Sequence, residues 1–133
     1  MEYITVPAKT ESLTDVTAFI EEALAETGCL PRTQAQINIA VEELFVNIAH
    51  YAYETEGSAT IGCDVAGGMA TITFIDSGAP YNPLLKEDAN TSMAAHERQI
   101  GGLGILIVKK SMDDIDYRYE DGKNILTIKK QLP

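Results

Sequence analysis

The chain is poor in cysteine, in basic residues and in long apolar runs. Its 133 residues include two cysteines, Cys29 and Cys63, which are too few and too far apart for a disulfide framework or a zinc site. We expect both to be small buried hydrophobic residues. No apolar run approaches the roughly 18–20 residues that span a bilayer, and the start "MEYITVPAKT" lacks the basic and apolar regions of a signal peptide. We therefore expect a cytoplasmic protein without a membrane partner.

Basic residues are outnumbered two to one by acidic residues. Ten Lys and Arg residues stand against 20 Asp and Glu residues, which gives a net charge of −10. Such a surface repels nucleic acid and anionic lipid, so we exclude both as general partners. A nucleotide is not excluded, because a few backbone N–H groups, one arginine and a divalent cation can hold its phosphates locally. The length suits one domain, residues 1–133.

Hydrophobic periodicity predicts a chain of mixed helices and strands without internal repeats. Strands are predicted at 3–8, 60–65, 69–75, 115–121 and 124–132, and helices at about 13–27, 34–54 and 103–112. Thr33 with Gln36 fits a capping box at the start of the long helix, and Gly67-Gly68 marks a hairpin. Because hairpins join neighbouring strands, we predict an α+β fold. It would be a two-layer sandwich, with a mostly antiparallel sheet and the helices on one face.

Two features lie just before the third helix. Residues 84–100 are long for a connection inside a compact domain, and we interpret them as a flap over a ligand. The sequence "GGLG" at 101–104 then opens the helix, and free backbone N–H groups at a helix start favour an anion. The spacing fits neither the Walker A pattern nor the dinucleotide fingerprint. A tight helix entry is the alternative interpretation.

One flank of the long helix carries polar side chains beside its apolar stripe. At 100° per residue, Glu43, Asn47 and His50 fall within a strip about 60° wide, whereas Glu42 lies away from it. The carboxamide oxygen of Asn47 is a suitable ligand for Mg²⁺, and Glu43 one turn earlier could act as a base. A solvated helix flank is the alternative.

The segment "DSGAPYNP" at 76–83 directly follows a predicted strand. Asp76 would lie at the end of the strand, where a carboxylate can recognise a ligand. Gly78 would let the backbone come close to a flat ring. An Asx turn followed by a loop that ends in proline is the alternative.

Three segments in this order resemble the motifs of a known superfamily. "VEELFVN", "DSGAPYNP" and "GGLGILIV" are similar to the N, G1 and G2 boxes of the GHKL (Bergerat) ATP-binding superfamily, which includes gyrase, histidine kinases and heat-shock chaperones. The most similar branch is that of the bacterial anti-sigma-factor serine kinases, whose C-terminal hairpin resembles "SMDDIDYRYEDGKNILTIKK". The resemblance covers about residues 34–131 and implies the Bergerat version of the predicted sandwich.

The resemblance implies roles for four residues on the helix and the strand end. Asn47 matches the asparagine that ligates Mg²⁺, and Glu43 matches the glutamate taken to be the general base. Asp76 matches the aspartate that accepts the exocyclic amine of adenine, and Gly78 helps to shape the adenine pocket.

It also implies roles nearer the C-terminus. The backbone of Gly102, Leu103 and Gly104 would meet the phosphates, with the preceding loop as an ATP lid. Arg98 resembles a basic residue that touches the γ-phosphate. The hydroxyl of Thr127 would support adenine, although an ordinary β-branched strand residue is an equal alternative.

The sequence departs from the family pattern at one histidine. Relatives often carry N-x-x-x-H-[AG]-Y, whereas "NIAHYAY" has Tyr51 at the histidine position and His50 one residue earlier. His50 would either lie near the phosphates as a nucleotide-binding residue or be solvated.

By this resemblance the protein is expected to bind ATP and Mg²⁺ and to act as a serine/threonine protein kinase. Its substrate would be a small anti-sigma-factor antagonist, and it would also sequester a sigma factor. Relatives in this branch often form dimers, so a homodimer is one expected state. The alternative function is an ATP-dependent protein-binding switch with little or no phosphoryl transfer, which would have no need of a base such as Glu43.

Overall fold

The computed structural model describes residues 1–53, 56–85 and 102–132, and within them the strands form one five-stranded sheet. The strands are β1 Glu2–Pro7, β2 Ser58–Ala66, β3 Met69–Asp76, β4 Asp114–Glu120 and β5 Lys123–Gln131. They lie in the order β1-β2-β3-β5-β4, and each neighbouring pair is antiparallel. The predicted sheet is confirmed, and it is antiparallel throughout.

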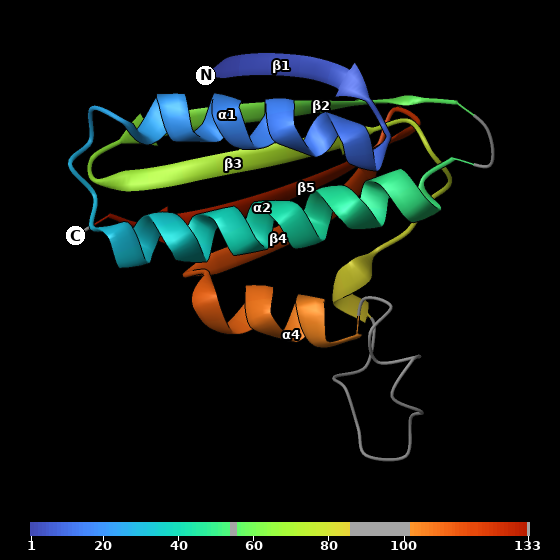
Figure 1. Cartoon of the computed structure of the whole chain (residues 1–133). Coiled ribbons are helices and arrows are strands. Elements are labelled where there is room, and N and C mark those ends of the chain that lie inside the picture. The colour runs from blue at the N-terminus through green and yellow to red at the C-terminus, as the bar shows by residue number, and fades with distance from the viewer. Residues whose placement is uncertain (54–55, 86–101, 133) are drawn as a thin grey trace.

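The helices form the second layer of the molecule. Among the described residues they are α1 Leu13–Leu24, α2 Pro31–Tyr51 and α4 Gly102–Ser111, and short 3₁₀ turns lie at Thr10–Ser12 and Pro83–Leu85. All three helices cover the same face of the sheet, with α2 between α1 and α4 (Figure 1). This is the two-layer α+β sandwich that the sequence predicts. Within the described part of the chain, no helix has both the length and the hydrophobicity to cross a bilayer.

The core lies between the two layers because side chains alternate along the strands and recur at helical spacing on α2. On β3, Ile72 and Phe74 point to the helices and are almost fully buried, while Thr71 and Thr73, which alternate with them, are half-buried. On α2, Ile37, Val41, Leu44 and Phe45 form the buried stripe. This stripe fixes the rotation of α2 about its own axis, and therefore fixes where its polar flank points.

The hairpin between β2 and β3 has the turn that its glycine pair predicts. Gly67 and Gly68 have φ values of 60° and 76°, as a two-residue turn with both central residues left-handed requires. The turn between β4 and β5 is similar, with φ of 53° at Asp121 and 75° at Gly122. Each turn sets the register of the hairpin that it closes, β2 with β3 and β4 with β5.

The long helix begins earlier than the capping pattern indicates. It starts at Pro31, so Thr33 lies inside the first turn and is buried, and no side chain caps the start. Proline at the first helical position has a preset φ and lacks only an N–H that would be unpaired there anyway. The helix also ends at Tyr51 and not at residue 54.

The two cysteines differ in burial. Cys63 is buried, as expected, and burial with smaller effects of Asp64 and Glu2 raises the pKa of its thiol to about 11. Cys29, in the connection between α1 and α2, is only half-buried, so the expectation for it is wrong.

Candidate functional site

A cavity lies where the C-terminal part of α2 crosses the end of β3. Most of its lining is apolar, with Leu44 and Ile48 from the helix and Phe74 and Leu126 from the sheet. Its polar lining includes Asn47, Asp76 and Asn124, and all three of these side chains are buried. A mostly apolar cavity with a few convergent polar groups is typical of a small-molecule site.

Asp76 is the charged side chain among the described residues that line this cavity. It is the last residue of β3 and its side chain is 6% exposed. One carboxylate oxygen, Oδ1, accepts a hydrogen bond from the backbone N–H of Gly78 at 2.9 Å. The Asx turn, the alternative interpretation of this segment, is therefore present, and the same carboxylate also lines the cavity.

Asn124 is a site residue that the sequence analysis missed. It lies directly opposite Asp76 in the pairing of β3 with β5, and its Nδ2 donates to Asp76 Oδ1 at 2.9 Å. Asparagine is depleted in strands, so an Asn at the start of the predicted strand 124–132 was a sequence signal that the residue is unusual, although it does not name its partners.

Asn47 reaches the cavity from the polar flank of α2. Its side chain is 7% exposed, and among the described residues its Nδ2 is the one buried side-chain nitrogen or oxygen without a hydrogen-bond partner. Leaving such a group unpaired is costly unless a ligand satisfies it. This orphaned amide is therefore an independent sign that the cavity takes a polar ligand.

Glu43 lies one helical turn before Asn47 and is half-buried. Burial, and to a smaller extent the charge of Glu42, raises the pKa of Glu43 above its ordinary value of 4.5. Its side chain does not line the cavity itself. A carboxylate with a raised pKa is a better proton acceptor than an ordinary surface glutamate.

His50 lies outside the cavity. Its side chain is exposed, and its ring meets the edge of Tyr51 with centroids 6.0 Å apart. Tyr51 in turn stacks on Tyr81, with ring centroids 6.1 Å apart, and Tyr81 lines the cavity. Of the two interpretations of His50, its exposure favours the solvated one.

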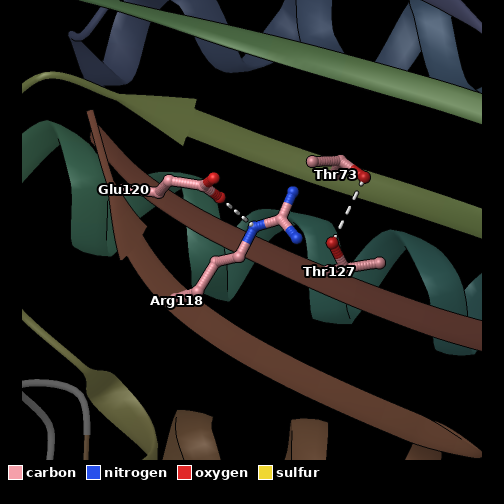
Figure 2. Close-up of polar contacts among 4 residues, drawn as sticks. All are labelled: Thr73, Arg118, Glu120 and Thr127. Carbon is pink, nitrogen blue, oxygen red and sulfur yellow. Dashed lines mark hydrogen bonds and ion pairs between the residues drawn. The ribbon is translucent and has the colours of Figure 1, made fainter. Parts of the chain in front are cut away.

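The prediction that Thr127 supports the ligand is wrong. Side chains alternate along β5, so Asn124 and Leu126 face the cavity and Thr127 faces the other side of the sheet. There its hydroxyl lies 3.4 Å from that of Thr73. Figure 2 shows this outer face with α2 passing behind the strands, and the exposed ion pair of Arg118 with Glu120 at 3.2 Å nearby.

The glycine cluster is described only in part. α4 begins at Gly102, within one residue of the predicted start, so Gly102, Leu103 and Gly104 form its first turn. Arg98 and the predicted lid beyond Leu85 lie outside the described residues. The roles given to them stay predictions.

Tyr53, just after α2, links the helix side of the site to its sheet side. Its hydroxyl donates to the carbonyl of Ser58 at 2.7 Å and accepts from the N–H of Ser77 at 2.8 Å. The end of α2 is thereby tied to the start of β2 and to the residue after Asp76.

Curated relatives resemble the chain at low sequence identity. The serine-protein kinase RsbW of Listeria innocua is 22% identical over 130 residues, which cover 93% of this chain and 83% of that protein. The anti-sigma F factor of a Thermoanaerobacter species is 28% identical over 93 residues, 69% of this chain. This chain covers 65% of that factor, just under two thirds of its length.

Solved structures share the fold. The structure of the RsbU and RsbW domains of a Mycobacterium tuberculosis protein is similar with a TM-score of 0.66 at 18% identity, over 99% of this chain and 33% of that one. The catalytic domain of the histidine kinase ThkA is similar with a TM-score of 0.57 at 15% identity. The similarity covers 99% of this chain and 98% of that one. Residues 6–130 match the family described as the histidine kinase-like ATPase domain. The chain, whose three motif segments already resemble the GHKL boxes, therefore belongs to the histidine kinase-like ATPase domain family.

Proposed function

We propose that this chain binds ATP with Mg²⁺ and transfers a phosphoryl group to a serine or threonine of a small anti-sigma-factor antagonist. The observation that carries the proposal is the buried carboxylate of Asp76 in a mostly apolar cavity. Apolar walls suit a purine ring, and a fixed carboxylate is a suitable acceptor for the exocyclic amine of adenine.

The phosphate end of the nucleotide would lie toward Asn47 and the first turn of α4. Mg²⁺ usually keeps several waters and takes one or two protein ligands together with the phosphates, so a single asparagine is sufficient on the protein side. The metal would take the carbonyl oxygen of Asn47, and its unpaired Nδ2 could then donate to a phosphate oxygen. When bound, Mg-ATP supplies the phosphoryl group and the metal offsets its negative charge. The backbone N–H groups at the start of α4 would also favour the phosphates, because a helix start favours an anion.

Glu43 would accept the proton of the attacking hydroxyl. It lies on the same flank of α2 as Asn47, and its raised pKa brings it nearer to the neutral range in which a base works best. This carboxylate distinguishes a kinase from a passive binder, because holding ATP requires no base.

The partners follow from the relatives. One relative bears the name of a serine-protein kinase and another that of an anti-sigma factor. We infer that residues 1–133 act as one cytoplasmic domain, which phosphorylates a small antagonist protein and sequesters a sigma factor. A homodimer is part of the same proposal.

The test is transfer of label from γ-³²P ATP to a purified antagonist protein, with a sigma-factor binding assay in parallel. The wild type should label the antagonist and bind the sigma factor. The Asp76→Asn variant should label the antagonist and bind the sigma factor only at much higher ATP concentrations. The Thr73→Val variant, altered on the outer face of the sheet, is the matched control and should behave as the wild type. If the wild type binds ATP and the sigma factor but labels no protein, the protein is an ATP-dependent binding switch.

A further inference from the structure

Asn124 is held by more hydrogen bonds than a structural strand residue needs. It is 7% exposed and faces the cavity from β5. Its carbonyl oxygen Oδ1 accepts from the backbone N–H of Tyr81 at 3.0 Å and from the hydroxyl of Tyr117. Two donors on this oxygen fill both of its lone pairs.

The amide nitrogen of Asn124 is equally occupied. Its Nδ2 donates to Asp76 Oδ1 and to the carbonyl of Ala79, both at 2.9 Å, and lies 3.4 Å from the carbonyl of Gly78. The acceptors on one side and the donors on the other fix which way the amide points. A flipped amide would set its NH₂ against the N–H of Tyr81 and its oxygen against two acceptors, Asp76 Oδ1 and the carbonyl of Ala79, so the network favours one orientation.

The fixed amide in turn fixes the Asp76 carboxylate. The described hydrogen bonds to that carboxylate, from Gly78 and from Asn124, both end on Oδ1. The second oxygen, Oδ2, is then the one left to a ligand in the cavity. Because two donors hold Oδ1, the Asp76 carboxylate is restrained from rotating about its Cβ–Cγ bond.

We propose that Asn124 is the positioning residue for base recognition: it holds Asp76 so that one carboxylate oxygen can accept a hydrogen bond from an exocyclic amine. The cavity would therefore select purines that carry this amine. The inference rests on the proposed ATP-binding function and adds a residue that acts through Asp76.

The chemistry of position 124 explains why an amide is needed there. Asp76 and Asn124 are directly opposed across β3 and β5, so the donor reaches the carboxylate with no intervening group. An aspartate at 124 would put a second carboxylate against Asp76 and the carbonyl of Ala79. An alanine would leave the N–H of Tyr81 and the hydroxyl of Tyr117 without their acceptor.

The test compares two nucleotides in each variant by calorimetry: ATP, and purine riboside triphosphate, in which hydrogen replaces the 6-amino group. In Asn124→Ala and Asn124→Asp the affinity for ATP should fall roughly tenfold to a hundredfold, the usual effect of losing a charge-assisted hydrogen bond. The affinity for the analogue should change much less, because it has no amine for Asp76 to receive. A purely structural role of Asn124 predicts equal losses for both nucleotides.

Two further variants make the outcome decisive. Tyr117→Phe removes one donor from Asn124 and adds no atoms, so it tests the same idea if the Asn124 variants do not fold; ATP affinity should fall roughly twofold to tenfold and analogue affinity should not. Thr73→Val is the control and should change neither. If the wild type does not prefer ATP to the analogue, recognition of the amine is wrong and the inference fails with it. If the wild type does prefer ATP but the variants lose both nucleotides equally, the inference alone is overturned.

Discussion

Gly78 lies directly against the backbone of Ala52. A β-carbon built on Gly78 would be 2.0 Å from the carbonyl oxygen of Ala52, far inside contact distance. The end of α2 and the turn after β3 can approach this closely only because residue 78 has no side chain. The helix that carries Asn47 and the strand that carries Asp76 are thereby brought to the same cavity.

A Gly78→Ala variant should lose both stability and nucleotide binding. The methyl group would meet backbone, which cannot rotate away, so the free energy of unfolding should fall by about 1–3 kcal/mol, as for overpacked sites. ATP affinity should fall with it, because α2 must move away from Asp76. Urea unfolding and calorimetry measure the two effects.

Gly68→Ala is the matched control for this variant. Gly68 has φ of 76° in the hairpin between β2 and β3, and its added β-carbon would meet no atom within 4 Å. The strain of a left-handed alanine should cost about 1–2 kcal/mol while ATP binding stays unchanged. A Gly78→Ala protein as stable as the wild type would show that the close approach to Ala52 is not required.

Asp76→Asn should weaken ATP binding. It removes the charged acceptor for the exocyclic amine and places an amide against the donor of Asn124. The expected loss is about 1.5–3 kcal/mol, or roughly tenfold to a hundredfold in affinity. Calorimetry with ATP and GTP is the measurement, and a wild type that binds the two equally would contradict the assignment of Asp76.

Sequence patterns anticipated the parts of the fold that depend on local chemistry. Gly67-Gly68 predicts a left-handed turn because few other residue pairs allow it, and the stripe from Ile37 to Phe45 predicts which face of α2 is buried. The start of α2 was misplaced because the Thr33 capping pattern competed with Pro31, and the proline prevailed.

The errors at the site have a different cause. Thr127 was assigned from resemblance, although the alternation of Asn124, Leu126 and Ile128 already placed it on the opposite face. Asn124 itself gains its partners from the pairing of β3 with β5, between residues 48 positions apart. No local pattern reports such a contact.

Glu43→Gln should change how stability depends on pH. The pKa of Glu43 is raised by its burial, so the folded state binds more protons than the unfolded state between the two pKa values. The wild type therefore loses stability as pH rises through that interval above 4.5, and the glutamine variant does not. The variant should be more stable than the wild type at neutral pH, and this difference should vanish below pH 4.5.

Urea unfolding across that pH range measures the difference. Glu22→Gln, which alters an exposed side chain on α1, is the control and should show no pH-dependent gain. A constant offset between Glu43→Gln and the wild type at every pH would contradict the role of burial.

Asn47→Leu should stabilise the protein while abolishing its activity. The amide nitrogen of Asn47 is buried without a partner, and an apolar side chain of similar size removes that penalty, which is typically about 1–3 kcal/mol. Mg-ATP binding and phosphoryl transfer should both be lost with the amide. Asn38→Leu on the same helix is the control: Asn38 bonds to Gln34 and to Glu21, so its replacement should lower stability. A less stable Asn47→Leu protein would show that Asn47 serves the fold.

Glu43→Ala separates the kinase from the passive binder. Glu43 is assigned to the proton of the attacking hydroxyl and lies outside the cavity lining, so Mg-ATP affinity should remain nearly unchanged. Transfer of label to the antagonist should fall about 10²–10⁴-fold, the usual contribution of a positioned general base. Asn47→Leu should instead lose binding and transfer together, so the two variants on one flank of α2 should fail at different steps. If Glu43→Ala labels the antagonist as fast as the wild type, Glu43 is not the base, and its raised pKa reflects only burial beside Glu42.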